Sequence, residues 1–160
     1  MVREAQDVSH EALNVKRELL DARYASLDTR YERNYTMAKK ILIVEDHEMS
    51  RVLLRDVLQH HGYEIIEAAN GEEAIKEAGA HLPDLIFMDI QMPVMSGYAA
   101  IKALKSDDKT RHIKIVALTS LAMTGDKEKS LAARADYYIT KPIDTVQLPI
   151  MVAEWLKETR

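Results

Sequence analysis

Five residues whose side chains suit phosphoryl chemistry lie at the ends of short apolar runs. Glu45 and Asp46 follow the run ILIV, and Asp89 follows DLIFM. Thr119 follows IVAL, and Lys141 precedes a proline. Because a parallel sheet gathers the carboxyl ends of its strands along one edge, we expect these residues to lie together there.

Three of these residues are carboxylates, which repel one another when they lie close together unless a cation binds among them. Mg2+ prefers a few carboxylate oxygens together with waters and phosphate oxygens, so the cluster predicts a Mg2+ site. A carboxylate beside Mg2+, a hydroxyl group and a lysine can accept a phosphoryl group. The metal and Lys141 would neutralise charge on the equatorial oxygens while Asp89 attacks as the nucleophile.

The same residues stand in motifs that resemble the receiver (CheY-like) domain of bacterial two-component response regulators. The motifs are ILIVED, LIFMDIQMPVMSG, VALTS and YYITKPID, in the order and spacing of that family. Each motif alone is weak, whereas their joint order is highly specific. The resemblance covers about Lys39 to Lys157, and within the family it is greatest to stand-alone DivK-like regulators and to the receiver domains of hybrid kinases.

The resemblance implies a phosphoacceptor and a metal site. Asp89 would accept the phosphoryl group. Glu45, Asp46 and Asp89 would hold Mg2+, and the main-chain carbonyl of Gln91 would be a further ligand. Taken alone, Glu45 and Asp46 would instead suit a helix N-terminus, because carboxylates are favourable there.

The resemblance also implies how the site would signal. Thr119 and Lys141 would contact phosphoryl oxygens, and the bond from Lys141 to Pro142 would be cis. Tyr138 would be the aromatic residue that changes rotamer on activation. It is preferred over Tyr137 because it lies three residues before Lys141, and Tyr137 is interpreted as a packing or surface residue.

One segment departs from the family pattern. Arg134 stands where many relatives have a glycine, and Tyr137 stands where they have an acid. Both lie beside the expected output surface, formed by the fourth helix, the fifth strand and the fifth helix. The departure therefore bears on the identity of the partner and not on phosphorylation.

Other phosphate chemistries are disfavoured by motifs that the chain lacks. The phosphatases that use an Asp-x-Asp pair have a second acid two residues after the nucleophile, whereas Asp89 is followed by Ile90 and Gln91. No G-x-x-x-x-G-K-[ST] loop and no G-x-G-x-x-G fingerprint is present. Nucleotide hydrolysis and dinucleotide binding are therefore not expected.

Composition narrows the class of protein. A chain of 160 residues with 47% hydrophobic content is consistent with one globular domain and a modest extension. The net charge of −4 gives no basic nucleic-acid footprint, and no cysteine is present. No apolar run approaches the ~20 residues that span a bilayer, and no signal-peptide core precedes the domain. We expect a soluble, cytoplasmic bacterial protein without nucleic-acid or membrane partners.

The elements that must position the site follow from alternating apolar and amphipathic stretches, which predict a doubly wound α/β fold with a five-stranded parallel sheet. The flavodoxin-like strand order 2-1-3-4-5 is expected. The predicted strands are 41–44, 63–67, 84–88, 113–118 and 137–139. The predicted helices are 48–60, 71–80, one beginning after 96, one from 124 to 133, and 144–157.

Polar residues and prolines predict where several helices begin. Asn70, Ser96 and Thr124 are suited to cap helix N-termini. Pro149 is unfavourable inside a helix unless it lies in the first turn. The last helix is therefore expected to start late or to kink at Pro149.

Residues 1–36 differ from the receiver domain predicted at 37–160, because they contain neither Gly nor Pro. Leu13, Leu20 and Leu27 recur every seven residues, with Tyr24 and Tyr31 at intermediate positions, as on one seam of a helix. We expect a helical or partly disordered extension. One interpretation is a helix that packs on the domain or on a second subunit. The other is that Met37 is the natural start and that the first 36 residues are additional or poorly folded.

The sequence leaves three functions open. The first is a single-domain response regulator that takes a phosphoryl group from a histidine kinase or histidine phosphotransfer protein and binds a downstream protein effector. The second is a phosphorelay carrier between histidines, and the third is a structural adaptor. None is an enzyme beyond its own phosphorylation and dephosphorylation. A homodimer could form through 1–36 or through the face of the last two helices.

Overall fold

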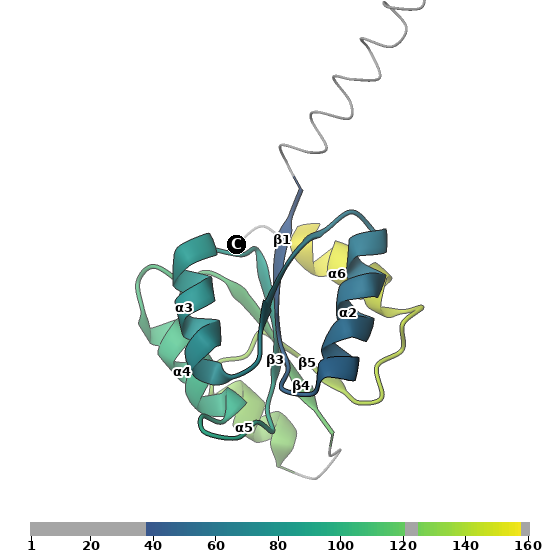
Figure 1. Cartoon of the computed structure of the whole chain (residues 1–160). Coiled ribbons are helices and arrows are strands. Elements are labelled where there is room, and N and C mark those ends of the chain that lie inside the picture. The colour runs from purple at the N-terminus through teal and green to yellow at the C-terminus, as the bar shows by residue number, and fades with distance from the viewer. Residues whose placement is uncertain (1–37, 121–124, 158–160) are drawn as a thin grey trace, which may run out of the picture. The chain divides into compact units, whose positions relative to one another are not determined.

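The computed structural model describes residues 38–120 and 125–157 of the chain. Within them, a five-stranded parallel sheet runs in the order β2-β1-β3-β4-β5, which confirms the predicted fold class and order (Figure 1). The strands are β1 Lys40–Val44, β2 Glu64–Ala68, β3 Leu85–Asp89, β4 Lys114–Thr119 and β5 Tyr137–Thr140. The expected extension at 1–36 lies outside the described residues.

Helices cover both faces of this sheet. They are α2 Glu48–His60, α3 Gly71–His81, α4 Gly97–Ser106, α5 Asp126–Ala132 and α6 Leu148–Lys157. Helices α2 and α6 pack on one face, and α3, α4 and α5 lie on the other (Figure 1). The three central strands are buried on both faces, as near-continuous apolar runs in parallel sheets require.

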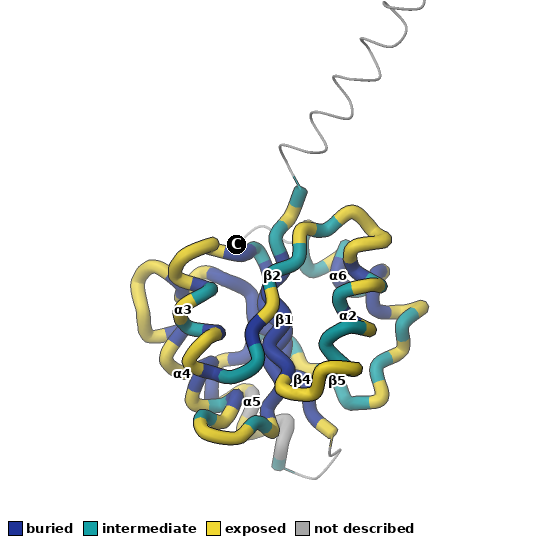
Figure 2. Tube along the Cα trace, viewed as in Figure 1, coloured by how far each residue is buried: buried dark blue, intermediate teal, exposed yellow. Residues whose placement is uncertain are grey.

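The core has two halves because successive strand side chains point to opposite faces. In β1, Leu42 and Val44 join the half under α3 and α4, whereas Ile41 and Ile43 join the half under α2 and α6. Figure 2 shows the buried strands between more exposed helices. Each side of the sheet is therefore held by its own apolar cluster, and the strand ends remain at the edge.

Two of the predicted helix caps are confirmed. The Asn70 side chain accepts a hydrogen bond from the amide of Glu73 at 2.9 Å, and Oγ of Ser96 accepts one from the amide of Ala99 at 3.3 Å. Thr124 lies outside the described residues, and Gly125 occupies the N-cap position of α5.

The start of the last helix differs from the prediction of about residue 144. Helix α6 begins at Leu148, so Pro149 lies in its first turn. Of the two expectations, a late start or a kink at Pro149, the late start is confirmed. The carboxylate of Asp144 accepts hydrogen bonds from the amides of Val146 and Gln147, which form a turn before the helix. This local capping favours a turn where the sequence pattern favoured helix.

Strands β2, β3 and β4 each begin one residue later than predicted. For β3 the cause is Asp84, whose carboxylate accepts a hydrogen bond from the amide of Lys40 at 2.9 Å and pairs with the ammonium of Lys39 at 3.2 Å. Asp84 therefore anchors the start of β1 from outside the strand. An apolar pattern cannot reveal such a contact between distant residues.

Candidate functional site

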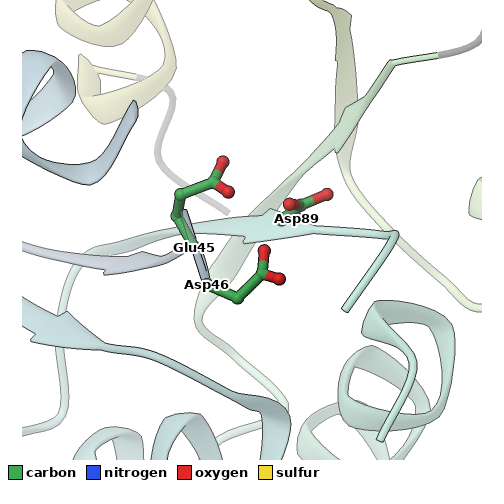
Figure 3. Close-up of side chains that lie close together, drawn as sticks. All are labelled: Glu45, Asp46 and Asp89. Carbon is green, nitrogen blue, oxygen red and sulfur yellow. The ribbon is translucent and has the colours of Figure 1, made fainter. Parts of the chain in front are cut away.

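The strand register brings the predicted site residues to one edge of the sheet. Asp89 lies beside Leu118, and Thr119 lies beside Thr140 on the next strand. Glu45 and Asp46 directly follow β1 at the same edge. Carboxylate oxygens of Glu45, Asp46 and Asp89 lie within 4.8 Å of one another (Figure 3).

Glu45 is buried and bound on both carboxylate oxygens. Oε2 accepts a hydrogen bond from Nζ of Lys141 at 2.5 Å, and Oε1 accepts one from the amide of His47 at 3.1 Å. Burial raises the pKa of Glu45, the contact with Lys141 lowers it in part, and the charge of Asp89 raises it further. The lysine therefore compensates for a carboxylate that is costly to bury.

Lys141 bridges the two buried acids. Its Nζ lies 3.2 Å from Oδ2 of Asp89 as well as 2.5 Å from Glu45. Burial lowers the pKa of Lys141, but the hydrogen bond to Glu45 and the charges of both carboxylates outweigh burial and raise this pKa. The ammonium group therefore stays charged beside Asp89. The bond to Pro142 is cis, as expected.

The Asp89 carboxylate is held from two sides. Oδ1 accepts a hydrogen bond from the amide of Gln91 at 3.0 Å, opposite the contact of Oδ2 with Lys141. Only 5% of the side chain is exposed. The Asp89 carboxylate is therefore oriented by an amide and a lysine. Asp46, at the same edge of the sheet, is exposed to solvent.

Gly97 allows helix α4 to start against the loop that carries Asp89. Its amide donates to the carbonyl of Ile90 at 3.1 Å. A Cβ atom at this position would lie 2.1 Å from the carbonyl oxygen of Asp89 and 2.7 Å from Cα of Ile90. Only glycine permits this approach, which explains the final glycine of the MPVMSG segment.

Thr119 and Lys141 are joined through the backbone. The amide of Lys141 donates to the carbonyl of Thr119 at 2.7 Å, and Thr119 is buried at the end of β4. The next residue, Ser120, donates its hydroxyl hydrogen to Oε1 of Gln91 at 2.8 Å. The sequence analysis did not predict this bond, for which no local pattern gives a signal.

The two tyrosines of β5 are placed differently. Tyr137 stacks on Trp155 of α6, with ring centroids 4.6 Å apart and planes at 20°, so it is a packing residue. Tyr138 is 41% exposed and lies beside Ala117 of β4. Arg134 has a φ of 69°, a left-handed conformation that explains why a glycine suits this position.

The donor groups fit Mg2+ well. Glu45, Asp46 and Asp89 offer hard oxygen ligands, and the one exposed acid leaves room for the waters that Mg2+ retains. No sulfur or imidazole donor is part of this carboxylate cluster, so a softer metal has no preferred ligand there.

No helix in the described part of the chain is long and apolar enough to cross a membrane.

Comparison with known proteins identifies a matching family model and similar response regulators. Residues 41–153 match the family model of the response regulator receiver domain. The chain is 48% identical over 107 residues to the polar-differentiation response regulator DivK of Brucella anthropi, covering 67% of this chain and 87% of that protein.

Solved structures are similar across nearly their whole length. The receiver domain of a sensor histidine kinase of Pseudomonas aeruginosa, with a magnesium ion coordinated in its active site cleft, has a TM-score of 0.71 at 30% identity, covering 76% of this chain and 99% of that one. A second similar structure is the co-crystal of the Saccharomyces cerevisiae histidine phosphotransfer signaling protein Ypd1 with the receiver domain of its downstream response regulator Ssk1. The matching chain of that co-crystal has a TM-score of 0.69 at 33% identity, covering 74% of this chain and 88% of that one.

Proposed function

The chain belongs to the response regulator receiver family, and we propose that it accepts a phosphoryl group on Asp89 from a phosphohistidine and thereby changes its affinity for a protein partner. The observation that carries this proposal is the buried carboxylate of Asp89, which Lys141 and the amide of Gln91 orient beside Glu45 and Asp46. Receiver domains of response regulators are signalling proteins, and this one is proposed to promote only its own phosphorylation and dephosphorylation.

In the proposed transfer, a carboxylate oxygen of Asp89 forms the new O–P bond as the P–N bond of the phosphohistidine breaks. The bonding electron pair leaves with the imidazole nitrogen. Glu45, Asp46, Asp89 and the main-chain carbonyl of Gln91 would hold Mg2+, which would supply positive charge for the phosphoryl oxygens. Lys141 supplies further positive charge, since its Nζ lies 3.2 Å from Asp89.

The proposed switch follows from the new charge on Asp89. The Thr119 hydroxyl group moves to bind a phosphoryl oxygen, and Tyr138 turns into the space that Thr119 leaves. Thr119 lies on β4 and Tyr138 on the adjacent strand β5, where Thr119 pairs with Thr140 and Ala117 pairs with Tyr138. Partner affinity then changes at the surface around β5.

We further propose that the phosphohistidine protein docks over α2 and α6. Met49 and Leu53 lie one turn apart on α2, three and seven residues after Asp46. Val146 lies in the turn before α6, and Ile150 lies in the first turn of α6. All four apolar side chains are at least half exposed, and both helices cover the same face of the sheet. An apolar surface next to the acceptor site suits an amphipathic helix of the donor.

A carrier role is the second candidate, because the P. aeruginosa neighbour is the receiver domain of a histidine kinase. A carrier would lose its phosphoryl group rapidly to a second phosphotransfer protein. A response regulator would instead bind a protein that takes no phosphoryl group, and would bind it more tightly when phosphorylated. Adding each class of protein to the phosphorylated chain distinguishes the two roles.

The first prediction concerns the acceptor itself. Incubation with Mg2+ and acetyl phosphate should add one phosphoryl group to the parent protein and none to Asp89→Ala, as measured by intact mass. Asp108→Ala is the matched control, because Asp108 is an exposed aspartate whose carboxylate pairs with Arg111 at 3.0 Å. Chelation of Mg2+ should prevent the addition. Retained addition in Asp89→Ala, or none in the folded parent, would contradict the proposal.

A further inference from the structure

A closed circuit of hydrogen bonds passes through the Asp89 carboxylate. The amide of Gln91 donates to Oδ1 at 3.0 Å, and Nζ of Lys141 donates to Oδ2 at 3.2 Å. The amide of Lys141 donates to the carbonyl of Thr119 at 2.7 Å, and Oγ of Ser120 donates to Oε1 of Gln91 at 2.8 Å. Because Thr119 and Ser120 are consecutive residues, the circuit runs through the segments after β3 and β4 and returns to Asp89.

The bond between Ser120 and Gln91 differs from the other members of the circuit. It joins two exposed side chains, whereas the others involve main-chain groups or the partly buried pair of Lys141 with Asp89. Its loss would leave the backbone anchors of Gln91 and Lys141 intact. A hydrogen bond of this kind changes an equilibrium constant by roughly two- to tenfold, which is enough to bias a conformational switch without deciding whether the domain folds.

We infer that the hydrogen bond from Ser120 to Gln91 is a latch that stabilises the resting conformation of the site. This inference rests on the proposed function, in which Thr119 moves toward a phosphoryl group on Asp89. Ser120 is joined to Thr119, so the same movement withdraws its hydroxyl group, while the amide of Gln91 stays on Asp89. A bond that exists only in the resting state opposes the switch by its own free energy.

The latch is a positioning device and takes no part in the chemistry. Gln91 is proposed to serve the metal site through its main-chain carbonyl, and its amide holds Asp89, so neither function needs the carboxamide side chain. Gln91→Met therefore removes the acceptor of the latch and retains the length of the side chain. Ser120→Ala removes the donor with little change in size.

The test uses beryllofluoride, a non-covalent mimic of the phosphoryl group, and the full chain with Mg2+. Ser120→Ala and Gln91→Met should each bind beryllofluoride about two- to tenfold more tightly than the parent, because no latch has to break. The double variant should equal either single variant, since the second change removes nothing more. Ser106→Ala is the matched control, because Oγ of Ser106 donates to the carbonyl of Lys102 at 2.7 Å outside the circuit.

Two further readouts separate a latch from a simple structural role. Without beryllofluoride, the ring resonances of Tyr138 in Ser120→Ala should move part of the way toward their positions in the beryllofluoride-bound parent. The affinity of Ser120→Ala for Mg2+ alone should equal that of the parent. A loss of Mg2+ affinity in Ser120→Ala would overturn the latch, because it would mean that the bond positions Gln91 for the metal.

The outcomes also distinguish the latch from the proposed function. If the parent and all variants bind beryllofluoride with equal affinity, or if the single effects add in the double variant, the latch is wrong and the receiver chemistry stands. If the folded parent neither binds beryllofluoride nor accepts phosphate on Asp89, the proposed function fails and the latch fails with it.

Discussion

Lys141 holds the resting site together, because one ammonium group lies between two buried carboxylates. Its contacts with Glu45 and Asp89 offset the cost of burying negative charge at the strand ends. In the proposed phosphorylated state the same ammonium would bind a phosphoryl oxygen. The residue therefore takes part in both conformations, and its removal should separate phosphorylation from switching.

Lys141→Ala should still accept a phosphoryl group from acetyl phosphate, at a reduced rate, because Asp89 and the proposed metal ligands remain. The conformational response should be lost, since no ammonium group remains to join the phosphoryl group to β5. Intact mass measures the first effect, and the ring resonances of Tyr138 with and without the phosphoryl group measure the second. An unchanged Tyr138 response would count against this coupling. Lys129→Ala, at an exposed lysine of α5, serves as the control.

At the scale of the elements, helix α4 is connected to the site at one end and to β5 at the other. Gly97 begins the helix in direct contact with the loop of Asp89. Near its end, Nζ of Lys105 donates to Oδ2 of Asp136 at 2.7 Å and to the carbonyl of Ile113 at 2.6 Å. The helix therefore spans the distance between the loop of Asp89 and the segment that leads into β5.

Gly97→Ala should destabilise the domain by about 3 kcal/mol, because the added Cβ would overlap the carbonyl of Asp89 and force the acceptor loop to move. Phosphorylation should slow as well. Gly79→Ala is the matched control, since Gly79 lies within α3 with no atom within 4 Å of an added Cβ, and there alanine should stabilise by about 0.5–1 kcal/mol. Urea unfolding measures both, and equal effects would refute the steric argument.

The ion pair between Lys105 and Asp136 should contribute strongly, because their side chains are only 5% and 7% exposed. Lys105→Ala should lower the free energy of unfolding by about 3–5 kcal/mol, since it leaves a buried carboxylate without its charged partner. Arg111→Ala removes the exposed pair with Asp108 and should cost less than about 1 kcal/mol. Chemical denaturation of both variants measures the two changes in the free energy of unfolding. Similar decreases would show that the cost of breaking an ion pair does not depend on its burial.

At the scale of the whole described domain, two surfaces have different proposed tasks. The face with α2 and α6 presents exposed apolar side chains beside the proposed acceptor site, where a phosphohistidine would approach. The surface around β5 carries the exposed side chain of Tyr138, where a change of conformation would be recognised by the effector. Donor and effector could then bind different surfaces of one molecule.

Leu53→Lys should reduce phosphoryl transfer from a phosphohistidine protein by about tenfold or more, because a charge placed in an apolar contact removes an anchor of the complex. Labelling by acetyl phosphate should be unchanged, since that donor needs no docking surface. Leu131→Lys, at an exposed leucine of α5, is the matched control. Transfer rates from both donors measure the effect. An equal decrease in the transfer rate from both donors would mean that the substitution disturbs the site itself and not the docking surface.

The sequence by itself determined the fold and the membership of the site. Alternating apolar and amphipathic stretches set the parallel α/β arrangement, and a parallel sheet brings its strand ends to one edge whatever the details of packing. The sequence alone therefore places five residues at one edge: Glu45, Asp46, Asp89, Thr119 and Lys141. Caps at Asn70 and Ser96 were also predictable, because their hydrogen bonds are local.

Only the tertiary structure decided which of these groups contact one another. The bridge from Lys141 to both acids, the bond from Ser120 to Gln91 and the buried pair of Lys105 with Asp136 join residues 96, 29 and 31 positions apart at their widest. Such contacts depend on strand register and side-chain rotamers. Local sequence periodicity predicts neither the register nor the rotamers, because the free energy that selects them arises when the elements pack together.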